Sequence, residues 1–171
     1  MSSRNKRSAR VAVKKYSAPA ATLGASKPGN RKESQRLWMV VVGDVLVFLI
    51  FSIIGTYSHE GLMGIGQIIW TALPFILSWF LIAPFLGAFR RELMTQPKAI
   101  ALKTMLAWLA AWPLGVVLHF VFDWHVISVV STLSFALVTL ITNVIFLLIW
   151  RVPFATANMM RDRQRQVSAE K

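Results

Sequence analysis

The sequence predicts an all-α protein: a four-helix transmembrane bundle made of two helical hairpins, with both termini in the cytoplasm. Four apolar runs each reach about 20 residues, the length that a helix needs to cross a hydrocarbon layer of ~30 Å. Nothing in these runs alternates between polar and apolar residues, as the strands of a membrane barrel do. All 19 Lys and Arg residues lie in the segments on one side of the runs. This positive-inside pattern assigns those segments to the cytoplasm.

The basic residues fall into three groups. Ten precede Leu37, four lie between Arg90 and Lys103, and five lie from Arg151 onward. The loops around His59 and Trp124 contain none. Because topology accounts for the net charge of +12, we expect no nucleic-acid partner. We expect instead that anionic lipid at the cytoplasmic face attracts the basic residues, by about 1 kcal/mol for each one near the surface.

The first hairpin follows a basic tail. Residues 1–36 are rich in Ser, Ala, Lys and Arg and poor in large apolar side chains, which predicts a disordered cytoplasmic segment. The first helix is predicted over Leu37–Tyr57, with Trp38 as an interfacial anchor. The second helix is predicted over Ile68–Phe89, and Pro84 is expected to bend it because proline has no N–H to donate.

The second hairpin begins after a short basic loop. Its helices are predicted over Ile100–Phe122 and Val126–Trp150, joined by a tight outer turn. Pro153 is expected to discourage continuation of the fourth helix, and the polar tail from Met159 onward has room for one or two further helical turns along the membrane surface. The transmembrane domain therefore covers residues 37–151, and residues 152–171 form a polar cytoplasmic tail. This organisation predicts a multi-pass protein of the plasma membrane.

Composition and motifs give no support for catalysis. The chain has no cysteine, which excludes disulfides, thiolate catalysis and cysteine-ligated metals. The sequence also has no phosphate-binding glycine loop and no G-x-S-x-G nucleophile elbow. We therefore expect a protein that is not an enzyme and that has no cofactor.

Asp44 is the most informative polar residue inside a predicted helix. It lies seven residues after Leu37, and so about 10 Å below the cytoplasmic boundary. An ionisable group at that depth costs several kcal/mol unless it is paired, hydrated or protonated. Asn143 lies at a similar depth on the fourth helix, and Thr139 is one turn deeper on the same face. Two interpretations stay open: Asp44, partnered by Asn143, accepts a proton or cation, or the two form a structural hydrogen bond between helices.

A second polar group lies on the predicted outer face. It comprises His59, Glu60, His119, Asp123 and His125. Histidine and carboxylate groups in such proximity can bind a divalent metal or sense pH. They are also typical of ordinary polar side chains near the membrane–water interface. Because no two histidines lie one helical turn apart, we expect no metal site.

Four short motifs are shared with a known family. They are Gly43-Asp44, Gly55-x-x-Ser58-His59, Pro74-Phe75 and Trp150-Arg151. Together they resemble an uncharacterised domain-of-unknown-function family of small bacterial and archaeal integral membrane proteins with four predicted helices. The resemblance covers Val40–Arg151 and implies the topology and the candidate positions, but no activity, because none is established for the family. The family pattern has an Arg near the outer end of the third helix, where this chain has His119, so a titratable charge replaces a permanent one.

These observations lead to two main hypotheses. The first is a small transporter or ion-handling protein that uses Asp44; since four helices enclose little space, it would work as a homo-oligomer. The alternative is a non-catalytic membrane scaffold or accessory subunit. A membrane enzyme acting on lipid would need the outer histidine group as its acid, base and nucleophile.

Overall fold

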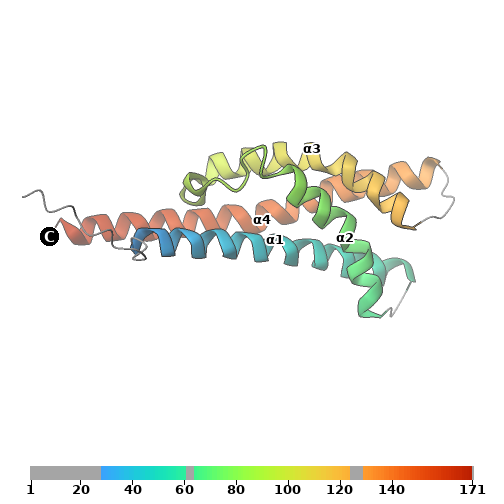
Figure 1. The fold of residues 1–171 in the computed structure, drawn as a ribbon, viewed down its shortest axis with the longest axis horizontal. Coiled ribbons are helices and arrows are strands. Elements are labelled where there is room, and N and C mark those ends of the chain that lie inside the picture. The colour runs from blue at the N-terminus through green and yellow to red at the C-terminus, as the bar shows by residue number, and fades with distance from the viewer. Residues whose placement is uncertain (1–27, 61–63, 124–128, 171) are drawn as a thin grey trace, which may run out of the picture.

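The computed structural model describes residues 28–60, 64–123 and 129–170, which form four α-helices and one short 3-10 helix (Figure 1). The elements are α1 (Pro28–Glu60), α2 (Ile65–Ile82), the 3-10 helix η1 (Arg91–Thr95), α3 (Pro97–Asp123) and α4 (Val129–Ala169). No strand occurs in this part of the chain. The prediction of an all-α fold with four long helices is therefore confirmed.

Each helix packs against the next one in the chain, and α4 returns to pack against α1. In Figure 1, α1 and α4 lie side by side, while α2 slants across from the far end of α1 toward α3. The bundle encloses a core of aromatic and small residues. A second, smaller core lies around η1 and comprises Val40, Leu93, Met94, Ile100 and Ala155.

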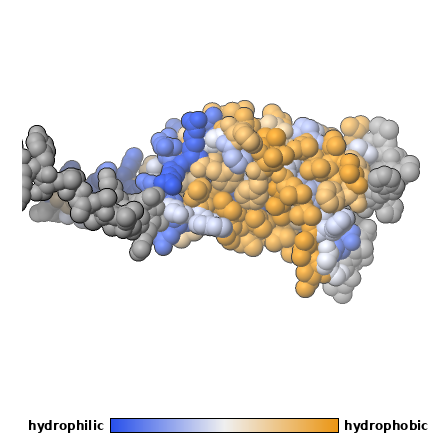
Figure 2. Space-filling model, in the orientation of Figure 1, coloured by the Kyte–Doolittle hydropathy of each residue, from blue (hydrophilic) through white to orange (hydrophobic). Residues whose placement is uncertain are grey.

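All four helices are long and apolar enough to cross a membrane. Their outward faces carry large apolar side chains; Trp38, for example, is 66% exposed and Leu81 is 56% exposed. Figure 2 shows this apolar body, with hydrophilic residues gathered at one end of it. Apolar surface this continuous is atypical of a soluble monomer. These features support a multi-pass membrane protein.

The ends of α1 and α4 differ from the predicted boundaries. The first helix begins at Pro28 rather than Leu37, and the fourth runs through Pro153 to Ala169 instead of ending at Trp150. The fourth helix therefore continues through the residues that are predicted to form the polar cytoplasmic tail. At 1.5 Å per residue the 41 residues of α4 span about 60 Å, so this helix extends well beyond a ~30 Å hydrocarbon layer.

Long-range contacts explain why these two helices continue. Two hydrogen bonds of 2.8 and 2.6 Å join the guanidinium of Arg36 on α1 to the carboxylate of Asp162 on α4. Ala155 and Asn158 on the same part of α4 are buried. Pro153 lies on the exposed side of the helix, so its ring does not disturb the packing of α4 on its neighbours, although it removes one backbone hydrogen bond and crowds the carbonyl one turn earlier. Packing therefore outweighs the local tendency of Pro153 to end the helix.

The second helix ends earlier than predicted. Regular α-helix stops at Ile82, so Pro84 lies in the following turn and does not bend a longer helix. In this turn the N–H of Gly87 donates to the carbonyl of Pro84, and the N–H of Ala88 donates to the carbonyl of Ala83, both at 3.0 Å. This pair of bonds is a Schellman motif, which needs the positive φ of 73° that Gly87 adopts. The reversal directs the chain from Ala88 onward to η1, across the face of the bundle.

Candidate functional site

The centre of the bundle holds a buried ion pair between Asp44 on α1 and Arg151 on α4. Both side chains are 0% exposed. Nε of Arg151 donates to Oδ1 of Asp44 at 2.9 Å, and Nη2 donates to Oδ2 at 2.5 Å. The guanidinium therefore binds the carboxylate through two parallel bonds, the strongest and most specific geometry for this pair.

The remaining polar atoms of the pair are bound by the other helices. Nη1 of Arg151 donates to the carbonyl of Ala88 at 2.9 Å and to Oγ1 of Thr104 on α3 at 3.3 Å. Nε1 of Trp79 on α2 donates to Oδ2 of Asp44 at 3.0 Å. One charge pair thus connects all four helices with the turn that follows α2.

Two aromatic rings lie against the guanidinium of Arg151. Its central carbon is 5.0 Å from the ring centre of Trp79 and 4.7 Å from that of Phe89. At these distances the negative ring faces attract the cation. Since Trp79 also donates to Asp44, its indole contacts both members of the pair and holds them in register.

Arg151 is the functional residue that sequence reasoning missed. The predicted end of the fourth helix at Trp150 places Arg151 at the membrane boundary. The structure places Arg151 inside the bundle, level with Asp44. The sequence feature that indicates this pairing is the presence of two dipeptides, Gly43-Asp44 and Trp150-Arg151. In each of them, a residue that packs between helices directly precedes a charged residue.

Gly43 explains how the two charges come within reach. A Cβ atom built on Gly43 would lie within 3.0 Å of three atoms of the Trp150 indole. The indole therefore packs directly against the backbone of α1, which a larger residue would prevent. Gly43 and Trp150 directly precede Asp44 and Arg151 in the sequence. The contact between Gly43 and Trp150 therefore sets the distance between the two charged side chains.

Asn143 and Thr139 belong to a different part of α4. Both are buried, but Nδ2 of Asn143 donates to the carbonyl of Thr139 at 3.0 Å, and Oγ1 of Thr139 donates to the carbonyl of Phe135 at 2.7 Å. Oδ1 of Asn143 has no hydrogen-bond partner among the described residues. Asn143 is therefore not the partner of Asp44: it lies about 12 Å along α4 from Arg151.

An aromatic layer fills the core beside the ion pair. The ring of Phe48 lies 5.4 Å from that of Trp108 and 6.3 Å from that of Trp79, measured between centres. Phe75 extends the layer, with its ring 6.5 Å from Trp108. The indole N–H of Trp108 donates to the carbonyl of Leu140 at 3.0 Å. Bulky rings from α1, α2 and α3 thus fill the core of the bundle next to the ion pair.

The predicted outer cluster is described only in part. The ring of His119 stacks on Phe135, with centres 4.5 Å apart and planes at 20°, and it lies 5.8 Å from Phe75. This places His119 among aromatic side chains. The side chains of His59, Glu60 and Asp123, and the whole of His125, lie outside the described residues. Within the described residues, no three His, Cys, Asp or Glu side chains lie close enough to hold a metal.

Comparison with known proteins gives one match. Residues 41–154, which include both members of the ion pair, match the model of a family described as "Protein of unknown function (DUF3054)". No match was found among curated proteins or among solved structures.

Proposed function

The chain belongs to the DUF3054 family of proteins of unknown function, and we propose that it serves as a non-catalytic membrane scaffold or accessory subunit. In this role it lies in the plasma membrane with both termini in the cytoplasm. Its rigid four-helix body holds the extended ends of α1 and α4 in a fixed position outside the bilayer. There they are available to a partner.

The observation that carries this proposal is that the hydrogen-bonding atoms of Asp44 and Arg151 all have partners within the protein. Every hydrogen-bonding nitrogen of Arg151 donates to Asp44, Ala88 or Thr104. Both carboxylate oxygens of Asp44 accept bonds. A substrate ion would have to displace these bonds, and the neighbouring aromatic layer would block its further passage. An ion pair whose polar atoms are all bound within the protein suits a structural role, in which it joins the helices to one another.

A specific observation favours ion handling as the second candidate. Two buried amide atoms on α4, Oδ1 of Asn143 and Nδ2 of Asn158, have no hydrogen-bond partner among the described residues. Buried polar atoms normally have partners, and exceptions at functional sites often bind water or an ion. Asn143 and Asn158 lie on opposite sides of Arg151 along α4. Oδ1 of Asn143 is an acceptor that would bind water or a cation, and Nδ2 of Asn158 is a donor that would bind water, so the two would begin a hydrated path past the ion pair.

Ion flux distinguishes the two candidates. Wild type and the double variant Asp44→Asn/Arg151→Met are reconstituted in liposomes, and proton and cation flux is measured. The double variant removes both charges and leaves neither buried alone. For a scaffold we expect no flux above empty liposomes from either protein. Flux in wild type, absent from a double variant with the same elution volume and melting temperature, would contradict the scaffold and favour ion handling.

The proposed orientation is tested by thiol labelling. The chain has no cysteine, so a single cysteine introduced at an exposed position is the one thiol that a maleimide can label. We expect Arg163→Cys on α4 to react with a membrane-impermeant maleimide only in inverted vesicles. Gly64→Cys, at the other end of the bundle, should react only in intact cells, and its added side chain meets no neighbouring atom. The reverse pattern would place the termini outside.

A further inference from the structure

The seam between α1 and α4 contains an apolar groove at the level of the membrane. It has a volume of about 350 Å³ and is lined by Gly43, Leu46, Val47, Ile50, Phe146, Ile149 and Trp150. Every lining residue is apolar or glycine, and Leu46, Ile50 and Ile149 are 49–65% exposed. The groove therefore opens toward the lipid.

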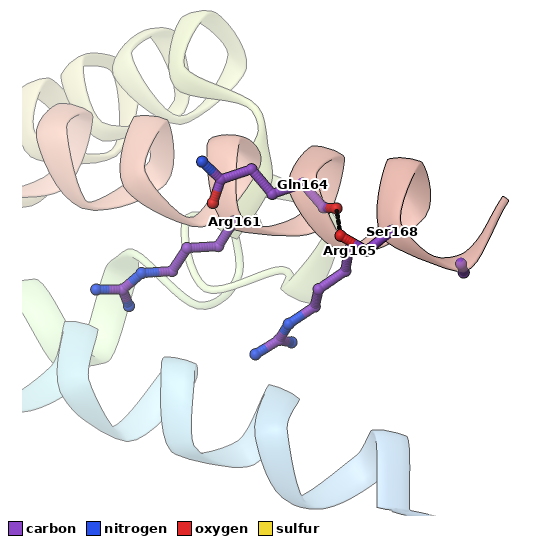
Figure 3. Close-up of a pocket in the computed structure, with 5 residues that line it drawn as sticks. Arg161, Gln164, Arg165 and Ser168 are labelled. Carbon is purple, nitrogen blue, oxygen red and sulfur yellow. Dashed lines mark hydrogen bonds between the residues drawn. The ribbon is translucent and has the colours of Figure 1, made fainter. Parts of the chain in front are cut away.

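A basic hollow of about 440 Å³ lies farther along α4, outside the predicted span. It is lined by Arg161, Gln164, Arg165, Ser168 and Ala169. Figure 3 shows the side chains of Arg161 and Arg165 extending from α4 on the side that faces α1. Arg165 is 59% exposed, and its Nη1 is 4.0 Å from Oδ1 of Asp162, the limit of an ion pair. Most of its charge is therefore available to a ligand.

The groove and the hollow lie on the same face of α4. Arg161 follows Trp150 by 11 residues, which is about three full turns, and Ser168 follows Trp150 by 18 residues, about five turns. From the middle of the groove, near residue 148, to Arg161 is about 20 Å along the helix. One leaflet of a bilayer, from its centre to its headgroups, is also about 20 Å thick.

We propose that this seam binds one anionic phospholipid, with an acyl chain in the groove and the phosphate against Arg161 and Arg165. The distance between the groove and Arg161 matches the distance between the acyl chains and the phosphate of a phospholipid. The apolar groove suits an acyl chain, and the two guanidinium groups suit a phosphate. Arginine recognises phosphate oxygens through paired bonds.

This inference goes beyond the scaffold role, since a specific lipid site does not depend on what the protein holds. It is tested on the purified full-length protein, delipidated in detergent, by native mass spectrometry. The probes are phosphatidylglycerol and phosphatidylcholine with identical acyl chains. We expect one phosphatidylglycerol per chain, bound more tightly than phosphatidylcholine. Arg161→Gln should weaken phosphatidylglycerol binding roughly fivefold.

Two further variants make the test specific. Arg163→Gln carries the same charge change two residues away, about 200° around the helix, and should alter binding less than twofold. Leu46→Trp fills the groove from its exposed side and should weaken binding of both lipids. Equal losses in Arg161→Gln and Arg163→Gln would show diffuse attraction and overturn the site. Unchanged binding by Leu46→Trp would overturn the acyl-chain groove, and a dimer that excludes lipid would assign the seam to a second copy.

Discussion

Arg151→Met is expected to lower the free energy of unfolding by about 3–5 kcal/mol, because it leaves Asp44 charged and buried without its partner. Asp44→Asn is expected to have a comparable effect, since it leaves Arg151 buried and only partly bound. The cost in each case comes from the charge that remains. It exceeds the value of the pair itself, because desolvation offsets much of the attraction between two buried charges.

The double variant Asp44→Asn/Arg151→Met should recover a large part of that loss. The Asn side chain still accepts the bond from Trp79, and Met fills the space between Trp79 and Phe89 that the guanidinium occupies. The two single variants and the double form a thermodynamic cycle, measured by denaturant or thermal unfolding in detergent. A double variant as unstable as the sum of the singles would show that the two residues do not act as a pair.

The partly buried pair of Arg36 and Asp162 is the matched control. Its guanidinium–carboxylate contact is also bidentate, but the two side chains are 18% and 37% exposed. Arg36→Met should therefore cost only about 0–1 kcal/mol. This comparison separates the effect of burial from that of losing an Arg–Asp contact.

Gly43→Ala is expected to destabilise the bundle by about 1–3 kcal/mol, the usual effect of overpacking a close contact. The added Cβ would lie within 3.0 Å of three atoms of the Trp150 indole. The rigid ring must then move away from α1, which separates Asp44 from Arg151. Measured melting temperatures should fall, and the smaller side chain in Gly43→Ala/Trp150→Leu should restore part of the loss.

Gly55→Ala provides the control on the same helix. Gly55 lies within α1, and a Cβ there meets no neighbouring atom within 4 Å. Alanine lowers the backbone entropy lost on folding, so this change should stabilise the protein by about 0.5–1 kcal/mol. If both glycine variants shift the melting temperature in the same direction, the close approach at Gly43 does not control the packing of α1 on α4.

The local pattern of residues along the chain is sufficient to predict the class of fold and the presence of a buried acid in the first helix. Four long apolar runs correspond to the four helices of the bundle, because the need to pair every backbone group in lipid makes a long apolar run helical. Asp44 was identified for the same local reason: a charge inside an apolar run must find a partner. Neither inference needs knowledge of how the helices are arranged.

The partner of Asp44 and the ends of the helices, in contrast, depend on contacts between distant parts of the folded chain. Arg151 is 107 residues away in the chain, and its height relative to Asp44 depends on how Trp150 packs against Gly43. The continuation of α4 past Pro153 depends on tertiary packing: Ala155 and Asn158 are buried, and Asp162 pairs with Arg36, which is 126 residues away in the chain. Helix-forming tendency is a local property of the chain. The height of one helix relative to another is set by contacts between residues that are far apart in the chain. Local sequence patterns therefore do not predict it.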